Sequence, residues 1–203
     1  MSSPSAMRAV SASDPGVRDR VLQSAIELFA DQGYDATSVA QVIGRAGVAK
    51  GGFYHYFASK EELLYVVYGE LITEQLAHLR GIRAAGAPPA KQLRAIITDL
   101  VVTTTANAQR AVISVRELHK LGDERIAELR HARRRYHEAV VALVREAQRS
   151  GEFGDVASAE MVTFTIFGVI NELPLWYRRN GRKRPARIAT ELADFILAAL
   201  EPR

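Results

Sequence analysis

The chain has 203 residues, of which 48% are hydrophobic and 25% charged, and it contains no cysteine. This composition is typical of a globular protein with a substantial core, and it excludes a disulfide scaffold, a cysteine-based zinc site and a thiol nucleophile. Residues 1–16 lack the apolar core of a signal peptide, and the longest nearly apolar stretch, 161–170, is too short to span a membrane. We therefore expect a cytoplasmic protein with no membrane partner.

The net charge of +4 is the difference between 27 basic and 23 acidic residues. Such a small excess says little by itself, so the placement of the charges matters more. Residues 36–60 contain Arg45, Lys50 and Lys60 but no Asp or Glu, and residues 178–187 contain six basic residues and again no acid. The sequence thus has two separate basic zones, which can serve different partners.

The first half of the chain shows apolar residues at helical spacing and no long run that alternates with period two. The first 13 residues, rich in Ser and Ala, are expected to form a flexible tail. Asp14 and Pro15 are suited to start a first helix that Gly33 ends. Thr37 is expected to cap a short second helix before a turn at Gly47, and a third helix is expected over residues 49–56.

The second half of the chain is also expected to be helical. A capping box from Ser59 to Glu62 opens a long helix that reaches about residue 80, and residues 84–90 form a linker. Further helices are expected after Pro89, over residues 111–121, over residues 123–150, and from about 155 to a stop at residues 180–181. A last helix begins at Pro185.

Residues 37–60 carry the chemistry, because two short helices joined by a tight glycine turn are typical of a helix-turn-helix. The apolar residues of this segment can form a small core with the first helix, which leaves Lys50, Gly51, Gly52, Tyr54 and His55 facing outward. Lys and Tyr can bind phosphates and base edges, and glycine lets a backbone approach DNA closely. Hydroxyls and N–H groups at a helix start can bind phosphate. The residues expected to contact DNA are Thr37, Ser38, Lys50, Gly51, Gly52, Tyr54, His55, Tyr56 and Lys60.

A second interpretation is a helical small-molecule carrier or enzyme in which the helix pair is purely structural. The sequence lacks a nucleophile elbow, a phosphate-binding loop, a dinucleotide fingerprint and a zinc-protease motif. Its five histidines do not form a convincing metal set. We therefore expect no enzyme activity, no metal and no cofactor.

Residues 37–63 resemble the signature of the tetracycline-repressor (TetR) family, with Ile43 and Tyr56 as the two departures from its pattern. The resemblance extends upstream through the first helix. It implies an all-helical homodimer that binds a double-stranded DNA operator and is usually a repressor released by a small-molecule effector. The matching residues are Thr37, Val42, Ala46, Gly47, Val48, Gly51, Phe53, Tyr54, Phe57, Lys60 and Leu63.

The resulting prediction is an all-α fold of about nine helices in two domains. An N-terminal three-helix helix-turn-helix domain, residues 14–75, follows a tail of residues 1–13 and is joined by a long helix to residues 76–203, a helical ligand-binding and dimerisation domain. The apolar run of 161–170 and an apolar stripe on the last helix are assigned to a four-helix dimer interface. That stripe consists of Ile188, Leu192, Phe195 and Ile196.

The C-terminal half is similar to an actinobacterial branch of the family that controls lipid and sterol catabolism and senses acyl-CoA thioesters. The similarity lies in residues 116–121, in the Arg-rich segment 130–136 and in residues 171–181, where Pro174 is unusual. It implies that arginines bind the phosphates of coenzyme A while aromatic residues line an acyl cavity. Alternatively, the arginines are simply solvated and the aromatic residues are plain core. The candidate ligand-binding residues are Arg133, Arg134, Tyr136, Phe164, Phe167, Trp176, Arg178 and Arg179.

Overall fold

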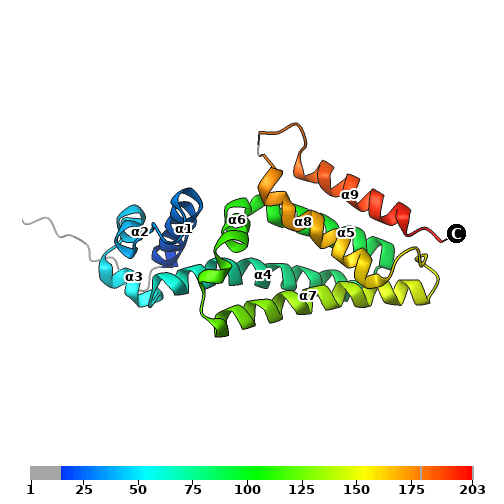
Figure 1. Ribbon diagram of the computed structural model, residues 1–203, viewed down its shortest axis with the longest axis horizontal. Coiled ribbons are helices and arrows are strands. Elements are labelled where there is room, and N and C mark those ends of the chain that lie inside the picture. Colours follow the sequence, from blue (N-terminus) through cyan, green and yellow to red (C-terminus); the bar gives the residue numbers. More distant parts are fainter. Residues whose placement is uncertain (1–14, 179, 203) are drawn as a thin grey trace, which may run out of the picture. The chain divides into compact units, whose positions relative to one another are not determined.

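Helices make up the secondary structure throughout the described part of the chain. The structure, a computed structural model, describes residues 15–178 and 180–202. Within these ranges it contains nine α-helices, one short 3-10 helix and no strand (Figure 1), so the all-α prediction is confirmed. The expected tail, the expected cap Asp14 and the candidate Arg179 lie outside the described residues. None of the helices described is long and apolar enough to cross a bilayer.

The chain divides into two compact units, one up to Val67 and one from Tyr68 onward. The division falls within helix α4 (Lys60–Ala84), which begins in the first unit and continues into the second. The boundary that we expected after residue 75 lies within this same helix.

The first unit contains α1 (Pro15–Gln32), α2 (Val39–Ala46), α3 (Lys50–Tyr56) and the start of α4. Helix α1 packs against both α2 and α3. Gly47 ends α2 in the left-handed conformation, with φ of 62°, which glycine adopts without steric cost, so the predicted turn is confirmed. The shared core contains Val21, Leu22, Ala25, Ile26, Phe29, Val42, Phe53, Phe57 and Leu63.

Helix α2 is capped by Ser38, so the expectation that Thr37 caps it was wrong. The Ser38 hydroxyl accepts a hydrogen bond from the Gln41 N–H at 3.2 Å, and the Gln41 side chain accepts one from the Ser38 N–H at 2.7 Å. This reciprocal pairing is a capping box. Ser59 caps α4 as predicted, since its hydroxyl accepts a hydrogen bond from the Glu62 N–H at 3.0 Å. The return half of the predicted capping box differs by one residue, because the Glu62 carboxylate accepts its hydrogen bond from the Ala58 N–H at 2.6 Å.

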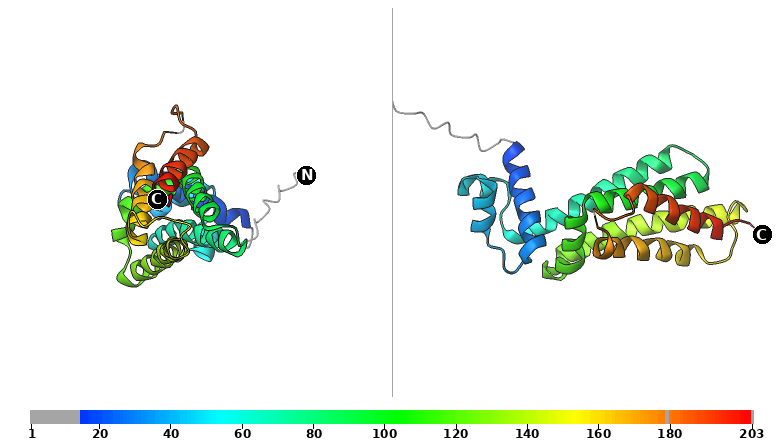
Figure 2. Two further views of the ribbon diagram at one scale, coloured as in Figure 1. Left: turned by 90° about the vertical axis from the view of Figure 1, so that its right-hand side faces the viewer. Right: turned by 90° about the horizontal axis from the view of Figure 1, so that it is seen from above.

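The second unit contains the rest of α4 together with α5 (Pro89–Ala106), α6 (Ala108–Glu117), α7 (Asp123–Arg149), α8 (Ala159–Trp176) and α9 (Pro185–Ala199). Helix α5 is central, because it contacts α6, α7, α8 and α9, and Figure 2 shows these helices from two further sides. Helix α6 begins three residues earlier than expected and passes into the 3-10 helix Leu118–Lys120.

Helix α8 is shorter at both ends than the sequence indicated. It begins at Ala159, because the Ser158 hydroxyl caps it through the Met161 N–H at 3.2 Å. It ends at Trp176, two residues after Pro174 and ahead of the expected stop at residues 180–181. Pro174 cannot donate a backbone hydrogen bond to the Ile170 carbonyl, so it weakens this last turn, and the helix ends two residues later.

The expected apolar stripe of α9 largely packs within the chain. Ile188 and Ile196 are buried, and α9 makes its main contacts with α5. Only Phe195 of this stripe points strongly outward, with 68% of its surface exposed. The assignment of Ile188 and Ile196 to a dimer surface was therefore wrong, because they already complete the core of their own chain.

Candidate nucleic-acid interface and ligand pocket

Helix α3 presents a polar outer face over a buried aromatic inner face. Phe53 and Phe57 are buried with ring centroids 6.1 Å apart, and this packing orients the helix. On the opposite side Tyr54 is 50% exposed, and the Lys50 ammonium lies 6.0 Å from the centroid of its ring. His55 is exposed next to the half-buried Tyr56. The outer face therefore offers a cation, a phenol and an imidazole, which are groups that can contact phosphates and bases.

The two glycines of α3 differ in their surroundings. A Cβ atom at Gly52 would lie 3.5 Å from a Val17 methyl group, whereas a Cβ atom at Gly51 would meet nothing within 4 Å. Neither residue has a positive φ. Packing within the chain therefore gives no reason for glycine at Gly51, which faces solvent on the outer side of the helix.

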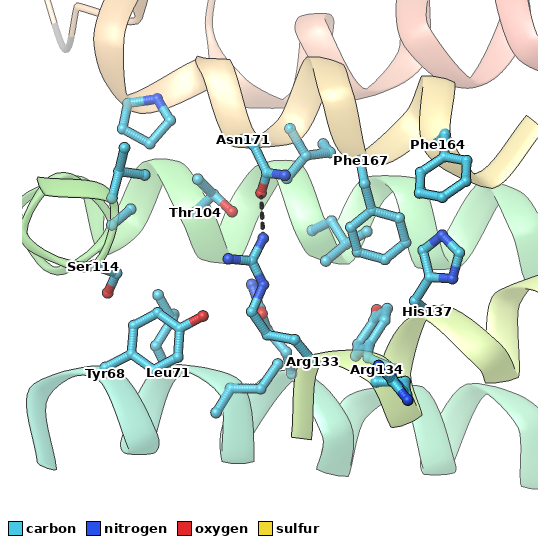
Figure 3. Close-up of a pocket in the computed structure, with 18 residues that line it drawn as sticks. Tyr68, Leu71, Thr104, Ser114, Arg133, Arg134, His137, Phe164, Phe167 and Asn171 are labelled. Atoms are coloured by element: carbon cyan, nitrogen blue, oxygen red, sulfur yellow. Dashed lines mark hydrogen bonds between the residues drawn. The ribbon is translucent and has the colours of Figure 1, made fainter. Parts of the chain in front are cut away.

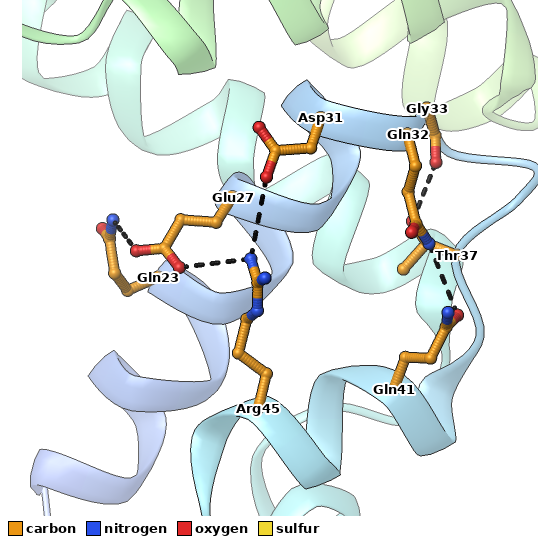
Figure 4. Close-up of polar contacts among 8 residues, drawn as sticks. All are labelled: Gln23, Glu27, Asp31, Gln32, Gly33, Thr37, Gln41 and Arg45. Atoms are coloured by element: carbon orange, nitrogen blue, oxygen red, sulfur yellow. Dashed lines mark hydrogen bonds and ion pairs between the residues drawn. The ribbon is translucent and has the colours of Figure 1, made fainter.

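Two of the three cations in the acid-free segment bind within the first unit. The Arg45 guanidinium pairs with Glu27 at 3.4 Å and with Asp31 at 3.8 Å, both on α1 (Figure 4). The Lys60 ammonium donates hydrogen bonds to the carbonyl oxygens of Tyr34 and Thr37, both at 2.8 Å. It also lies 4.2 Å from the centroid of the Tyr34 ring. The Arg45 ion pairs therefore connect α2 to α1, and the Lys60 hydrogen bonds connect the start of α4 to the loop that precedes α2.

Thr37 and Ser38 differ in their access to solvent. Thr37 is 1% exposed, and its hydroxyl donates a hydrogen bond to the Gly33 carbonyl at 2.8 Å while accepting one from Gln32 at 3.2 Å (Figure 4). Ser38 is exposed at the start of α2. Ser38 is therefore exposed on the first unit, which also carries the exposed Lys50 and Tyr54, whereas the Thr37 hydroxyl points inward.

The second unit contains a pocket between five helices, with a volume of about 300 Å³. This is at the lower end of the range of small-molecule sites, about 300–1,000 Å³. Figure 3 shows side chains from several helices converging on it. Residues that line it are Tyr68, Leu71, Ile72 and Gln75 of α4, Leu100 and Thr104 of α5, Ala111, Ser114 and Val115 of α6, Arg133, Arg134, Tyr136 and His137 of α7, and Phe164, Phe167, Ile170, Asn171 and Pro174 of α8.

Arg133 extends across the pocket and links α7 to α8. Its guanidinium donates a hydrogen bond to the Asn171 side chain on α8 at 3.2 Å, drawn as a dashed line in Figure 3. Its positive charge also acts on Tyr68 of α4. Burial raises the pKa of Tyr68, and the nearby Arg133 charge partly offsets this effect. Arg133 therefore places a positive charge beside an otherwise largely apolar cavity.

The structure brings five of the eight candidate ligand residues together at this pocket. Arg133, Arg134, Tyr136, Phe164 and Phe167 all line it.

Two further candidates lie elsewhere on the second unit. Trp176 is half exposed at the end of α8 and does not line the pocket. The Arg178 guanidinium donates hydrogen bonds to the carbonyl oxygens of Leu175 and Tyr177, at 3.1 and 3.2 Å, and so caps the end of that helix.

Several polar pocket residues were missed by the sequence analysis. Tyr68 and Gln75 lie on a helix that we read only as a connector, and Thr104 and Ser114 lie on predicted helices but were not chosen as candidates. Asn171 fell inside a segment that we had singled out but was not itself chosen. Helical spacing indicates which face is buried, but it does not indicate where five helices leave a space between them.

Comparisons with known proteins agree with these features. The family profile described as "Bacterial regulatory proteins, tetR family" matches residues 21–66, and "Tetracyclin repressor-like, C-terminal domain" matches residues 86–200. The HTH-type transcriptional repressor KstR2 of Rhodococcus jostii is 24% identical over 186 residues, 91% of this chain and 91% of that protein. The fatty acid metabolism regulator protein of Bacillus subtilis is 23% identical over 164 residues, 81% of this chain and 84% of that protein.

A solved structure of AibR in complex with isovaleryl coenzyme A and operator DNA shares the fold. It has a TM-score of 0.75 at 23% identity, and the match covers 89% of this chain and 97% of that one. The two profiles cover the helix-turn-helix and most of the second unit, and they show the family. The chain belongs to the TetR family of bacterial regulatory proteins, and it is a DNA-binding transcription regulator, not an enzyme.

Proposed function

We propose that this regulator is a homodimeric repressor that leaves a pseudo-palindromic operator when an acyl-CoA thioester binds. The observation that carries the effector assignment is the largely apolar pocket with Arg133 and Arg134 beside it. The names of the relatives support it, because one regulates fatty acid metabolism and AibR binds isovaleryl coenzyme A.

The DNA-binding surface in this proposal is the outer face of α3. Lys50, Gly51, Tyr54 and His55 are exposed there, and Gly52 and Tyr56 lie beside them half-buried. Ser38, at the exposed start of α2, is suited to bind a phosphate.

Thr37 and Lys60 take a different role in the proposal from the one suggested by their position in the sequence. Their side chains bind the loop that precedes α2. We therefore assign to them the positioning of α2 and α3, and any phosphate contact of Lys60 would use the remaining N–H of its ammonium.

The size of the pocket limits which part of an acyl-CoA can enter. Its volume of about 300 Å³ is roughly ten times the volume of a water molecule in the liquid, about 30 Å³. A group of about ten non-hydrogen atoms fits such a space, whereas the whole coenzyme is much larger. We place the acyl group in the pocket and the phosphates outside it, near Arg133 and Arg134, whose planar guanidinium groups can bind phosphate in a bidentate manner.

Residues at the end of α8 complete the proposed ligand site. Trp176 is half exposed and can stack on an adenine ring. Arg178 is exposed beside it, although two hydrogen bonds to carbonyl oxygens already hold its guanidinium. Arg133 and Arg134 therefore carry the larger share of phosphate binding in this proposal.

The proposed dimer rests on the exposed face of α8. Met161 is 57% exposed there, and Phe164, which also lines the pocket, is 60% exposed three residues further along the helix. Large apolar residues gathered on one exposed face are typical of an interaction surface. A two-fold dimer would also supply two copies of α3 for two half-sites of an operator.

A gel-shift titration tests the effector assignment. The operator would be a duplex selected from a random library by the wild-type protein, titrated with a panel of acyl-CoA thioesters and with the matching free acids. We expect release by the thioesters only. Release by the acids alone, or equal release by both, would support a neutral or carboxylate effector and refute the acyl-CoA assignment.

An arginine variant with a matched control sharpens this test. Arg133→Ala should weaken release by the thioester at least tenfold without changing DNA affinity, since a ligand acts on DNA only through its preference for one conformation. Arg149→Ala is the control, because Arg149 is exposed on the same helix but lies about 24 Å further along it, outside the pocket.

A further inference from the structure

Two polar atoms at the pocket are buried without a hydrogen-bond partner among the described residues. They are the hydroxyl of Tyr136 and the Nε2 atom of His137, and both residues line the pocket. Tyr136 is only 1% exposed, so bulk water does not serve its hydroxyl. More than about 90% of buried polar groups in native proteins are paired, so two such atoms at one cavity require an explanation.

The rings of both residues are fixed by aromatic contacts. Tyr136 meets Phe167 edge-on with centroids 5.7 Å apart, and the His137 ring lies 4.8 Å from Phe164 and 5.6 Å from Phe167. Figure 3 shows His137, Phe164 and Phe167 grouped at the same end of the pocket. Neither ring can turn to another partner without giving up these contacts.

The Tyr136 hydroxyl is available as a hydrogen-bond donor. Burial raises its pKa above the ordinary value, and the charge of Asp99 raises the pKa further. The phenol therefore stays protonated at any physiological pH. A saturated acyl chain in the pocket would leave this donor and the imidazole nitrogen unpaired, whereas a ligand oxygen would satisfy them.

We propose that the part of the effector inside the pocket carries a hydroxyl or ketone oxygen, and that the Tyr136 hydroxyl and the His137 imidazole bind it. This inference rests on the proposal that the pocket is the effector site, and it adds a chemical class to that proposal. The regulator then discriminates oxygenated acyl groups from plain hydrocarbon chains of the same length. Tyr136 and His137 are its specificity-determining residues.

Binding measurements on the full-length protein test the proposal with matched probes. Isothermal titration would compare octanoyl-CoA with hydroxyoctanoyl-CoA and oxooctanoyl-CoA isomers that carry the oxygen at successive carbons beyond the second. A second pair without coenzyme A, cyclohexanone and methylcyclohexane, would report on the pocket alone. We expect at least one oxygenated thioester to bind about tenfold or more tightly than octanoyl-CoA, and cyclohexanone to bind better than methylcyclohexane.

Variants identify the residue responsible for this preference. Tyr136→Phe removes only the hydroxyl and should reduce the preference for the oxygenated probe to less than about twofold, with octanoyl-CoA bound as before. Its melting temperature should equal or exceed that of the wild type, because an unpaired buried hydroxyl is lost. Tyr177→Phe is the matched control, because Tyr177 lies outside the pocket, and it should keep the full preference.

The possible outcomes distinguish a failure of this inference from a failure of the proposal that the pocket is the effector site. Equal binding of oxygenated and plain probes would overturn the inference while leaving the pocket as the effector site. A preference that survives Tyr136→Phe would show that the hydroxyl does not bind the ligand oxygen and would overturn the inference. A lowered melting temperature of this variant would overturn it too, because the hydroxyl would then serve the fold. A preference seen only with the cyclohexanone pair would refute the coenzyme A assignment and support the inference, and no binding by any probe would refute both.

Discussion

Replacing Lys60 with methionine should destabilise the first unit, although the sequence suggests a DNA contact at this position. Lys60 begins α4, and its ammonium donates hydrogen bonds to the carbonyl oxygens of Tyr34 and Thr37 at 2.8 Å each. The same charge lies 4.2 Å from the centre of the Tyr34 ring. Methionine has similar length but cannot donate a hydrogen bond, so the substitution removes all three interactions.

The magnitude follows from the geometry. Hydrogen bonds that involve a charged group contribute about 1.5–3 kcal/mol, and we take about 1 kcal/mol for each because Lys60 is only partly buried. A cation over an aromatic ring adds about 0.5–1 kcal/mol. The total loss is about 2–3 kcal/mol, which lowers the melting temperature by roughly 5–10 °C for a chain of this size.

Thermal unfolding followed by far-UV circular dichroism measures this effect, with Lys50→Met as the matched control. The Lys50 side chain is exposed, and its ammonium lies 6.0 Å from the centroid of the Tyr54 ring. Lys50→Met should therefore melt like the wild type while binding operator at least about tenfold more weakly. If Lys60→Met melts together with Lys50→Met, then Lys60 does not hold the loop and our interpretation of its contacts is wrong.

Three further outcomes are expected. Tyr54→Ala should reduce operator affinity by at least about 1 kcal/mol in a fluorescence anisotropy titration without lowering the melting temperature, and wild-type affinity would refute our placement of α3 on DNA. Gly51→Ala should stabilise the protein by about 0.5 kcal/mol, since alanine favours helices, yet it should weaken DNA binding tenfold or more, because the added methyl group separates α3 from DNA. The control Gly44→Ala on α2 should stabilise the protein by a similar amount and keep the DNA affinity of the wild type. Met161→Glu should yield monomers by light scattering and abolish operator binding, because it places a charge in the proposed interface. Phe195→Glu should have a smaller effect on both the dimer and operator binding, and a stable Met161→Glu dimer would refute the α8 interface.

Local sequence signals determined the helices and most of their ends. Helical spacing of apolar residues, the glycine at Gly47, the cap at Ser59 and the proline at Pro185 each act over a few residues, so they can be read from the sequence directly. The same locality explains the helix-turn-helix, because its turn and its inward residues lie within one short segment. The outward set on α3 followed from this spacing, and the structure leaves Lys50 and Tyr54 exposed as expected.

The sequence could not show which of the two neighbouring hydroxyl residues, Thr37 or Ser38, caps α2. Thr37 and Ser38 are both good helix caps, and both precede an apolar helix. Only the structure shows that Thr37 turns inward to the Gly33 carbonyl, which leaves the cap to Ser38. Side chains one position apart in an extended segment point in opposite directions, and packing against α1 decides which of the two is buried.

The availability of the basic side chains and the make-up of the pocket depend on contacts between segments that lie far apart in the sequence. The acid-free run looked uniformly available to DNA, but Arg45 pairs with two carboxylates that lie more than a dozen residues earlier on α1. Likewise the pocket gathers residues from five helices, and its two unpaired polar atoms depend on how Tyr136 and His137 pack against α8. Periodicity along one helix assigns a buried face, but the space that several helices leave between them, and the partners found there, are properties of the packed tertiary structure alone.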